Sequence, residues 1–247
     1  METGAAKKEI LAQLQKQILA MQGFKTVSDK QSLKTGLGII EQSFPGNTFP
    51  MGAIHEFISP AQGEAAATNG FIAGLLSGIM QKGGTALWIG TRRTLFPPAL
   101  KAFGIEPDRI VFIDLIRERD VLWAVEQALK CDALTAVVGE LKELGFTESR
   151  RLQLAVEESK VTGFIHRHEP KGKNTVACVS RWKIAPLSSD IAGNMPGVGH
   201  PRWDVNLLKV RNGTPGAWQI EWESGSFHHI QSKQPNIVSI SSTRNTG

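Results

Sequence analysis

The stretch that begins at Gly52 constrains the fold of this chain more than any other feature. It reads GAIHEFISPAQGEAAATNGFIAGLLSG, which predicts a strand over residues 53–58, a turn of small residues, and an Ala/Gly-rich apolar helix over residues 65–81. A strand, a turn and a helix in this order form the frame of the phosphate-binding loop of nucleotide hydrolases. The sequence therefore predicts an α/β domain built around this unit.

The same stretch lacks the residues of a working phosphate loop. Such a loop has the pattern GxxxxGK[ST], in which backbone N–H groups cradle the phosphates, Lys reaches them and Ser or Thr holds Mg²⁺. This turn has no lysine, and Glu64 places a negative charge where a triphosphate needs a positive one. We interpret the segment as a degenerate phosphate loop with its key positions at Ser59, Pro60, Gly63, Glu64 and Thr68.

The acidic residues of such an enzyme are also missing where the fold would place them. The apolar strand LTAVVGEL should end in an Asp that orders Mg²⁺, but it carries Gly139 and Glu140 there. The Glu140 carboxylate could touch a metal, but we expect it to face solvent or a partner. A catalytic acid should follow the strand TALWIG, where the chain instead has Arg92 and Arg93, which cannot activate water. The sequence thus predicts no ATPase activity, no cofactor and no metal, with a residual ATPase as the alternative.

Strand and helix patterns alternate along the rest of the chain. They end in two apolar-alternating runs around the turn RNGTPG, which predict a β-hairpin. This order favours a doubly wound, mostly parallel sheet with an antiparallel C-terminal hairpin. Strands are predicted over residues 85–90, 109–114, 133–139, 163–166 and 175–185, and helices over residues 98–103, 120–130 and 147–162.

The two ends of the chain differ from this core, which we place at residues 37–230. Residues 1–36 predict an amphipathic helical arm followed by a polar linker. The apolar stripe of the arm must be covered, either by its own domain or by a second protein. Residues 231–247 are polar and Ser/Asn-rich, which predicts a disordered tail. The stripe is formed by Ile10, Leu14, Ile18 and Met21.

Composition limits where the protein acts and what it contacts. The chain has 247 residues and a net charge of +5, which permits contact with nucleic acid without requiring it. Pairs of basic residues recur, and they indicate either a solvated surface or contact with nucleic acid or an acidic partner. The chain lacks a signal peptide and an apolar run of about 18 residues, so we predict a cytoplasmic protein without a membrane span. Two basic pairs, Arg92 with Arg93 and Arg150 with Arg151, are candidate partner-binding residues.

Several residues with chemical potential are given structural interpretations. His166 and His168 could share a metal ion, but a solvated strand end is the favoured reading. Cys131 and Cys178 are expected to be buried free thiols. Most of the six tryptophans are expected in the core, although Trp182 and Trp203 lie near basic or Gly/Pro-rich loops, where they could serve a partner or stack on a base.

These patterns resemble the RecA-type core, and within it they are similar to the ImuA family of RecA-like accessory proteins from bacterial damage-induced mutagenesis cassettes. The resemblance covers roughly residues 37–230. It rests on the runs GAIHEF, AAATNGFIAGLL, LWIGTRR, FPPAL, ALTAVVGEL, FTESRRLQLAVEES, VTGF, RWKIAPL and GVGHPRWDVNLLKVRNGTPGAW.

The resemblance implies a non-catalytic adaptor in SOS-induced translesion synthesis. Its partners would be an ImuB-like pseudo-polymerase and an error-prone DnaE-type polymerase, with RecA as a further candidate. RecA-type recombinases carry long mobile DNA-binding loops, whereas LKELGFTESRR here passes directly into a helix and HEPKGKN is a short turn. Weak or indirect DNA contact is therefore expected. The alternative function is that of the SulA-type cell-division inhibitors, which are also RecA-like.

Overall fold

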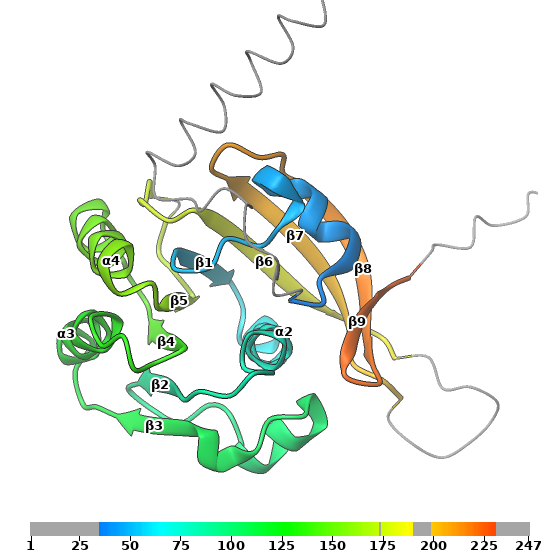
Figure 1. Cartoon of the computed structure of the whole chain (residues 1–247), viewed down its shortest axis with the longest axis horizontal. Coiled ribbons are helices and arrows are strands. Elements are labelled where there is room, and N and C mark those ends of the chain that lie inside the picture. The colour runs from blue at the N-terminus through cyan, green and yellow to red at the C-terminus, as the bar shows by residue number, and fades with distance from the viewer. Residues whose placement is uncertain (1–34, 173, 190–198, 231–247) are drawn as a thin grey trace, which may run out of the picture.

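The computed structural model describes residues 35–172, 174–189 and 199–230. These residues form one nine-stranded sheet in the order β3-β2-β4-β5-β1-β6-β7-β8-β9 (Figure 1). The predicted helical arm and the predicted tail lie outside the described residues. The strands are β1 (Ile54–Ser59), β2 (Ala86–Gly90), β3 (Ile110–Asp114), β4 (Ala136–Leu141), β5 (Thr162–His168), β6 (Ser180–Leu187), β7 (Arg202–Val210), β8 (Gly216–Glu223) and β9 (Ser226–His229). The helices are α2 (Gln62–Ile79), α3 (Glu118–Leu129) and α4 (Phe146–Ser159), with short 3₁₀ turns η1 (Gly38–Ser43), η2 (Pro45–Asn47), η3 (Pro97–Phe103) and η4 (Pro107–Arg109).

Six of these strands, from β3 to β6 in the sheet order, are parallel, as the α/β pattern predicted. Helix α2 covers one face of the sheet, and α3 and α4 lie side by side on the other (Figure 1). Successive residues of β4 therefore enter different cores. Val138 packs in the cluster that includes Phe71 of α2, and Val137 packs with Val125 of α3. Burial on both faces explains why these strands are continuous apolar runs in the sequence.

The C-terminal part of the sheet is antiparallel. Strands β7 and β8 form the predicted hairpin, and β6 and β9 flank it. Strand β6 begins at Ser180, so the strand predicted to begin at residue 175 is five residues too long at its start. Trp182 and Trp203 are buried at 0% and 3% exposure, and they pack against Phe71. The idea that either ring serves a partner or a base is therefore wrong.

The two cysteines lie in different environments. Cys178 is buried in the core beside α4, as expected, but Cys131 is exposed in the turn that follows α3. Helix α3 ends at Leu129, before Cys131, so the thiol is not part of the apolar stripe of that helix. Among the described residues, no helix combines the length and the apolar character needed to cross a membrane.

A neutral histidine joins β1 to the antiparallel half of the sheet. His55 is fully buried, and its Nε2 donates to the Pro50 carbonyl at 2.8 Å. Its Nδ1 therefore accepts from the Ser180 hydroxyl at 2.7 Å, and the same hydroxyl oxygen accepts from Trp182 Nε1 at 2.7 Å. Both ring nitrogens are satisfied without a positive charge. Burial lowers the pKa of His55 from 6.5 to about 4, although the hydrogen bond to Pro50 opposes the shift.

We predict opposite effects for the same substitution at two glycines of α2. A Cβ atom at Gly78 would lie 2.5 Å from the Thr35 carbonyl oxygen, and this contact is with backbone. Gly78→Ala should therefore cost about 1–3 kcal/mol, despite the better helix propensity of Ala. A Cβ atom at Gly63 meets nothing within 4 Å, so Gly63→Ala should be neutral or stabilising by up to about 1 kcal/mol. Urea unfolding measures both changes. Equal effects at the two sites would show that the close approach of Gly78 to Thr35 does not matter.

The burial of His55 predicts a stability that depends on pH. The unfolded chain binds a proton on this ring below about pH 6.5, whereas the folded chain does so only near pH 4, so stability is lost as the pH falls through this window. Between about pH 7 and about pH 5, His55 alone should remove about 2 kcal/mol from the free energy of unfolding. His55→Gln should reduce the loss by this amount. His229→Gln, at an exposed position, is the control. A loss of stability that is the same in His55→Gln and wild type would contradict the assignment.

Candidate functional site

The candidate site is a cavity at the carboxyl ends of the parallel strands. Its volume is about 330 Å³, and it lies where β1, β2 and β5 end beside the first turns of α2. Doubly wound α/β folds place their ligand sites at this edge of the sheet. Most of the residues that line it are polar, and they include Ser59, Gln62, Asn69, Arg92, Thr94 and His168.

The connection from β1 to α2 is shorter than the sequence suggested. Pro60 and Ala61 alone join the last residue of β1, Ser59, to the first residue of α2. The helix predicted to begin at residue 65 therefore begins three residues earlier, and Gly63 and Glu64 belong to its first turn. Thr68 Oγ1 donates to the Glu64 carbonyl at 2.9 Å and lies 2.8 Å from Ser59 Oγ. These hydroxyl groups are thus engaged within the protein.

Glu64 carries its negative charge at the start of α2. The positive end of a helix dipole favours a carboxylate in this first turn. Lys183 of β6 pairs with Glu64 at 3.2 Å, and the other carboxylate oxygen, Oε2, is buried without a hydrogen-bond partner among the described residues. The positive end of the α2 dipole therefore lies beside the Glu64 carboxylate, and Lys183 balances the charge of that carboxylate.

Glu140 is buried, which corrects the expectation that its carboxylate faces solvent or a partner. It is 4% exposed, and its Oε1 accepts hydrogen bonds from Trp88 Nε1 at 2.8 Å and from Thr94 Oγ1 at 2.7 Å. These two donors offset part of the cost of removing a carboxylate from water. Its second oxygen, Oε2, faces His168.

A directed chain of hydrogen bonds leads from Glu140 into α2 and β5. Because Thr94 donates to Glu140, its oxygen accepts from Asn69 Nδ2 at 3.0 Å, which leaves the Asn69 Oδ1 atom to accept from His166 Nδ1 at 2.8 Å. His166 Nε2 then lacks a proton in the neutral ring and accepts from Ser59 Oγ at 2.8 Å. Burial, and then the charge of His168, hold the pKa of His166 well below its usual value. The neutral ring is therefore the stable form in this chain of hydrogen bonds.

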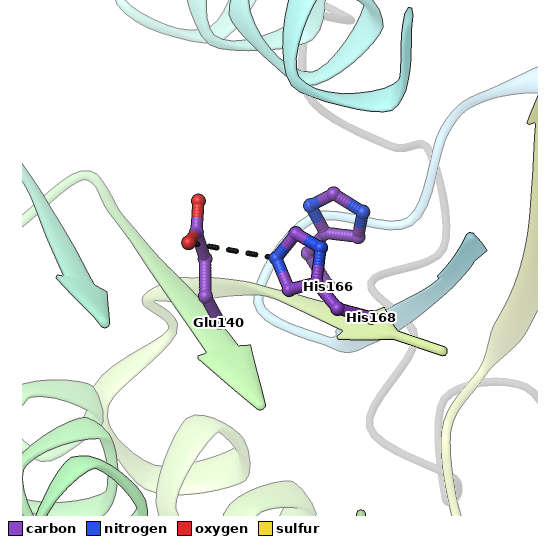
Figure 2. A group of neighbouring side chains, drawn as sticks. All are labelled: Glu140, His166 and His168. Carbon is purple, nitrogen blue, oxygen red and sulfur yellow. Dashed lines mark ion pairs between the residues drawn. The ribbon is translucent and has the colours of Figure 1, made fainter. Parts of the chain in front are cut away.

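His168 is the unsatisfied member of the site. Its ring lies against that of His166 with 3.9 Å between the ring centroids. Its Nε2 atom is buried, has no hydrogen-bond partner among the described residues, and lies 3.5 Å from Glu140 Oε2 (Figure 2). His166 is 0% exposed and the His168 side chain 16%, so the favoured reading of a solvated strand end is wrong. The register of β4 and β5 pairs Glu140 with His166, and this pairing across strands has no signal in the sequence.

The four candidate arginines lie in two places and serve different contacts. Arg92 lines the cavity and is exposed, whereas Arg93 pairs with Asp114 at 2.7 Å and lies 5.0 Å above the ring of Phe112. Arg150 is exposed on α4, and its neighbour Arg151 pairs with Glu126 of α3. Arg92 and Arg150 are therefore the members of these pairs with exposed side chains and no ion pair in the described part of the chain.

No sequence pattern predicted the buried ion network that lies beside the site. Arg167, which follows His166 on β5, is 0% exposed and donates to Glu56 at 2.9 Å and to Glu143 at 2.9 Å. Arg181 of β6 donates to the other oxygen of Glu56 at 2.5 Å. Removing one partner of such a buried pair typically costs about 3–5 kcal/mol. Arg167 thus belongs to the interior and not to a basic surface.

Comparisons with known proteins identify close relatives. The chain is 32% identical over 210 residues to Protein ImuA of Caulobacter vibrioides, in each of two strains, and the match covers 80% of this chain and 86% of the relative. It is 28% identical over 118 residues to the cell division inhibitor SulA of Photorhabdus laumondii, a match that covers 47% of this chain and 67% of that protein. A search of protein-family models gave no match.

Proposed function

This chain belongs to the ImuA family, and we propose that it acts as a non-catalytic RecA-like adaptor in SOS-induced translesion synthesis. The 32% identity to Protein ImuA over most of both chains is the observation that carries this proposal. The proposed protein partners are an ImuB-like pseudo-polymerase and an error-prone DnaE-type polymerase, and RecA is a third candidate. The place of action is then the cytoplasm.

The geometry at the start of α2 supports the non-catalytic part of the proposal. A phosphate loop needs a wide turn whose backbone N–H groups converge on an anion. Here the link has two residues, Pro60 and Ala61, and Pro has no N–H to offer. The Glu64 carboxylate occupies the helix start, and Lys183 is already paired with it. A nucleoside triphosphate would therefore be repelled by the Glu64 carboxylate and would find few free hydrogen-bond donors.

The distribution of basic residues supports weak DNA contact at most. Arg167 and Arg181 lie in the buried network around Glu56, and Arg93 and Arg151 are paired with acidic residues. Fewer cations are therefore available to neutralise phosphates than the 28 lysines and arginines of the chain suggest. An adaptor that reaches DNA through its protein partners fits this surface.

We predict that Mg-ATP binds more weakly than a dissociation constant of about 1 mM, which corresponds to about −4 kcal/mol. The reason is the missing cradle and the carboxylate of Glu64 at the helix start. Isothermal titration of the full chain measures the affinity, with an active RecA-type ATPase as the positive control. A micromolar dissociation constant, or ATP turnover that persists through purification, would overturn the non-catalytic assignment.

The apolar stripe of the N-terminal segment gives a test of the adaptor role. Leu14→Asp places a charge on the stripe, and it should weaken binding to the ImuB-like partner by several kcal/mol, about 100-fold or more. Ala12→Asp adds the same charge on the opposite side of the predicted helix and is the matched control. Co-purification from DNA-damaged cells measures the binding.

A thermal melt accompanies this experiment. Because the proposal places the stripe against a partner and outside the α/β sheet, Leu14→Asp should leave the melting temperature unchanged. Partner binding equal to that of the wild type would refute the docking role. Capture of a cell-division polymer instead of the ImuB-like protein would favour the SulA-type function.

A further inference from the structure

We propose that Glu140, His166 and His168 form a binding site for a first-row divalent transition metal, of which Zn²⁺ is the best match. Each residue offers one ligand atom, and these atoms all lie within 4.8 Å of one another. Two imidazoles and one carboxylate are a donor set that zinc sites with an open position use. This inference is independent of the adaptor role, because it rests on the geometry of these side chains alone.

The contact between Glu140 and His168 has the spacing of two ligands to one ion. Ligand atoms about 2.1 Å from a tetrahedral Zn²⁺ lie about 3.4 Å apart. The separation of Glu140 Oε2 and His168 Nε2 is 3.5 Å. His168 Nε2 is buried and has no hydrogen-bond partner in the described part of the chain, so the pair is not joined by a hydrogen bond. A buried nitrogen without a hydrogen-bond partner costs free energy unless another group, such as a metal ion, satisfies it.

The hydrogen bonds that Glu140 already makes suit a metal-binding carboxylate. Its Oε1 atom is held by Trp88 and Thr94, which fixes the carboxylate and leaves Oε2 for an ion. Metal-binding carboxylates and imidazoles are usually held in place by such outer contacts. The carboxylate would also supply the negative charge that a buried cation requires.

His166 can join the site without leaving a buried group unpaired. Its two ring nitrogens contact Ser59 and Asn69, and one of these contacts must give way for an ion to bind. Ser59 has a second partner in the Thr68 hydroxyl at 2.8 Å, so binding through His166 Nε2 leaves Ser59 satisfied while Nδ1 keeps its hydrogen bond to Asn69 Oδ1. Closing a separation of up to 4.8 Å to the tetrahedral spacing requires a shift of the order of 1 Å, which rotation of the side chain supplies.

The cavity beside His168 provides the fourth position. It is large enough, at about 330 Å³, for water or for a side chain of a bound protein to complete the coordination. The donors also select the ion. Imidazole nitrogens favour Zn²⁺ and its neighbours in the first row, whereas Mg²⁺ prefers oxygen ligands and retains its waters.

Metal titration of the full-length protein tests the proposal. After dialysis against a chelator, the chain should bind one equivalent of Zn²⁺ in a calorimeter, and Co²⁺ should give the visible absorption of a four-coordinate site with nitrogen and oxygen ligands. Zn²⁺ should raise the melting temperature, because it binds the folded chain only. Mg²⁺ should produce neither effect.

Two variants and one control separate this site from incidental binding. His168→Gln and Glu140→Gln should each weaken Zn²⁺ binding at least 10-fold and abolish the cobalt spectrum. A double variant at the exposed histidines, His228→Ala with His229→Ala, should leave both unchanged. The metal-free melting temperature shows whether each variant is folded. Absence of stoichiometric zinc binding in the wild type would overturn the proposal, as would tight binding that persists in both folded site variants.

Discussion

Strand β1 joins the two halves of the sheet, and each polar side chain of this strand is paired with a neighbouring strand. His55 bonds to Ser180 of β6, Glu56 to arginines of β5 and β6, and Ser59 to His166 of β5. Parallel strands covered on both faces have no water to satisfy such groups, so each needs a partner inside the protein. These three side chains tie β1 to β5 on one side and to β6 on the other. The register of the central sheet and the polar site at its edge therefore depend on the same strand.

This internal pairing explains why the edge of the sheet carries so few free donors. In a nucleotide-binding protein the end of the first strand leads into a loop whose N–H groups are open to phosphate. Here Ser59 turns toward His166 and Thr68, and the helix begins two residues later. The connection from strand to helix is short, and the polar side chains beside it bond to each other. These are the contacts on which the proposed lack of nucleotide binding rests.

The outline of the fold was predictable from the sequence because it follows from local patterns. The continuous apolar runs of the parallel strands, the Ala/Gly-rich helix and the turn RNGTPG each carry a signal within a few residues. The environments of Glu140, His166 and Arg167 were not predictable in this way. All three are polar residues near strand ends, which ordinarily face water, and their burial depends on which strands become neighbours and in which register. Only the fold places Glu140 beside Trp88 of β2 and His166 of β5.

The surface charge was equally hard to predict from the sequence. Basic pairs in the sequence indicate a basic surface, yet Arg167 is fully buried because Glu56, Glu143 and Asn174 receive its guanidinium. These partners come from β1, from the turn after β4 and from the turn after β5. A guanidinium with five donors needs several acceptors before it can leave water, and only tertiary structure assembles them. The number of basic residues therefore overstates the cationic surface of this protein.

Glu140 places a carboxylate near the end of β4, among neighbours that differ from those of a nucleotide site. A carboxylate at the end of this strand would order Mg²⁺ and a triphosphate only if it met water and phosphate oxygens. Glu140 instead meets an indole, a hydroxyl group and the imidazole of His168, and the imidazole of His166 lies tilted against that of His168. Nitrogen ligands disfavour Mg²⁺ and favour Zn²⁺. The side chains around Glu140 therefore favour an ion that protein ligands alone can hold, without a bound nucleotide.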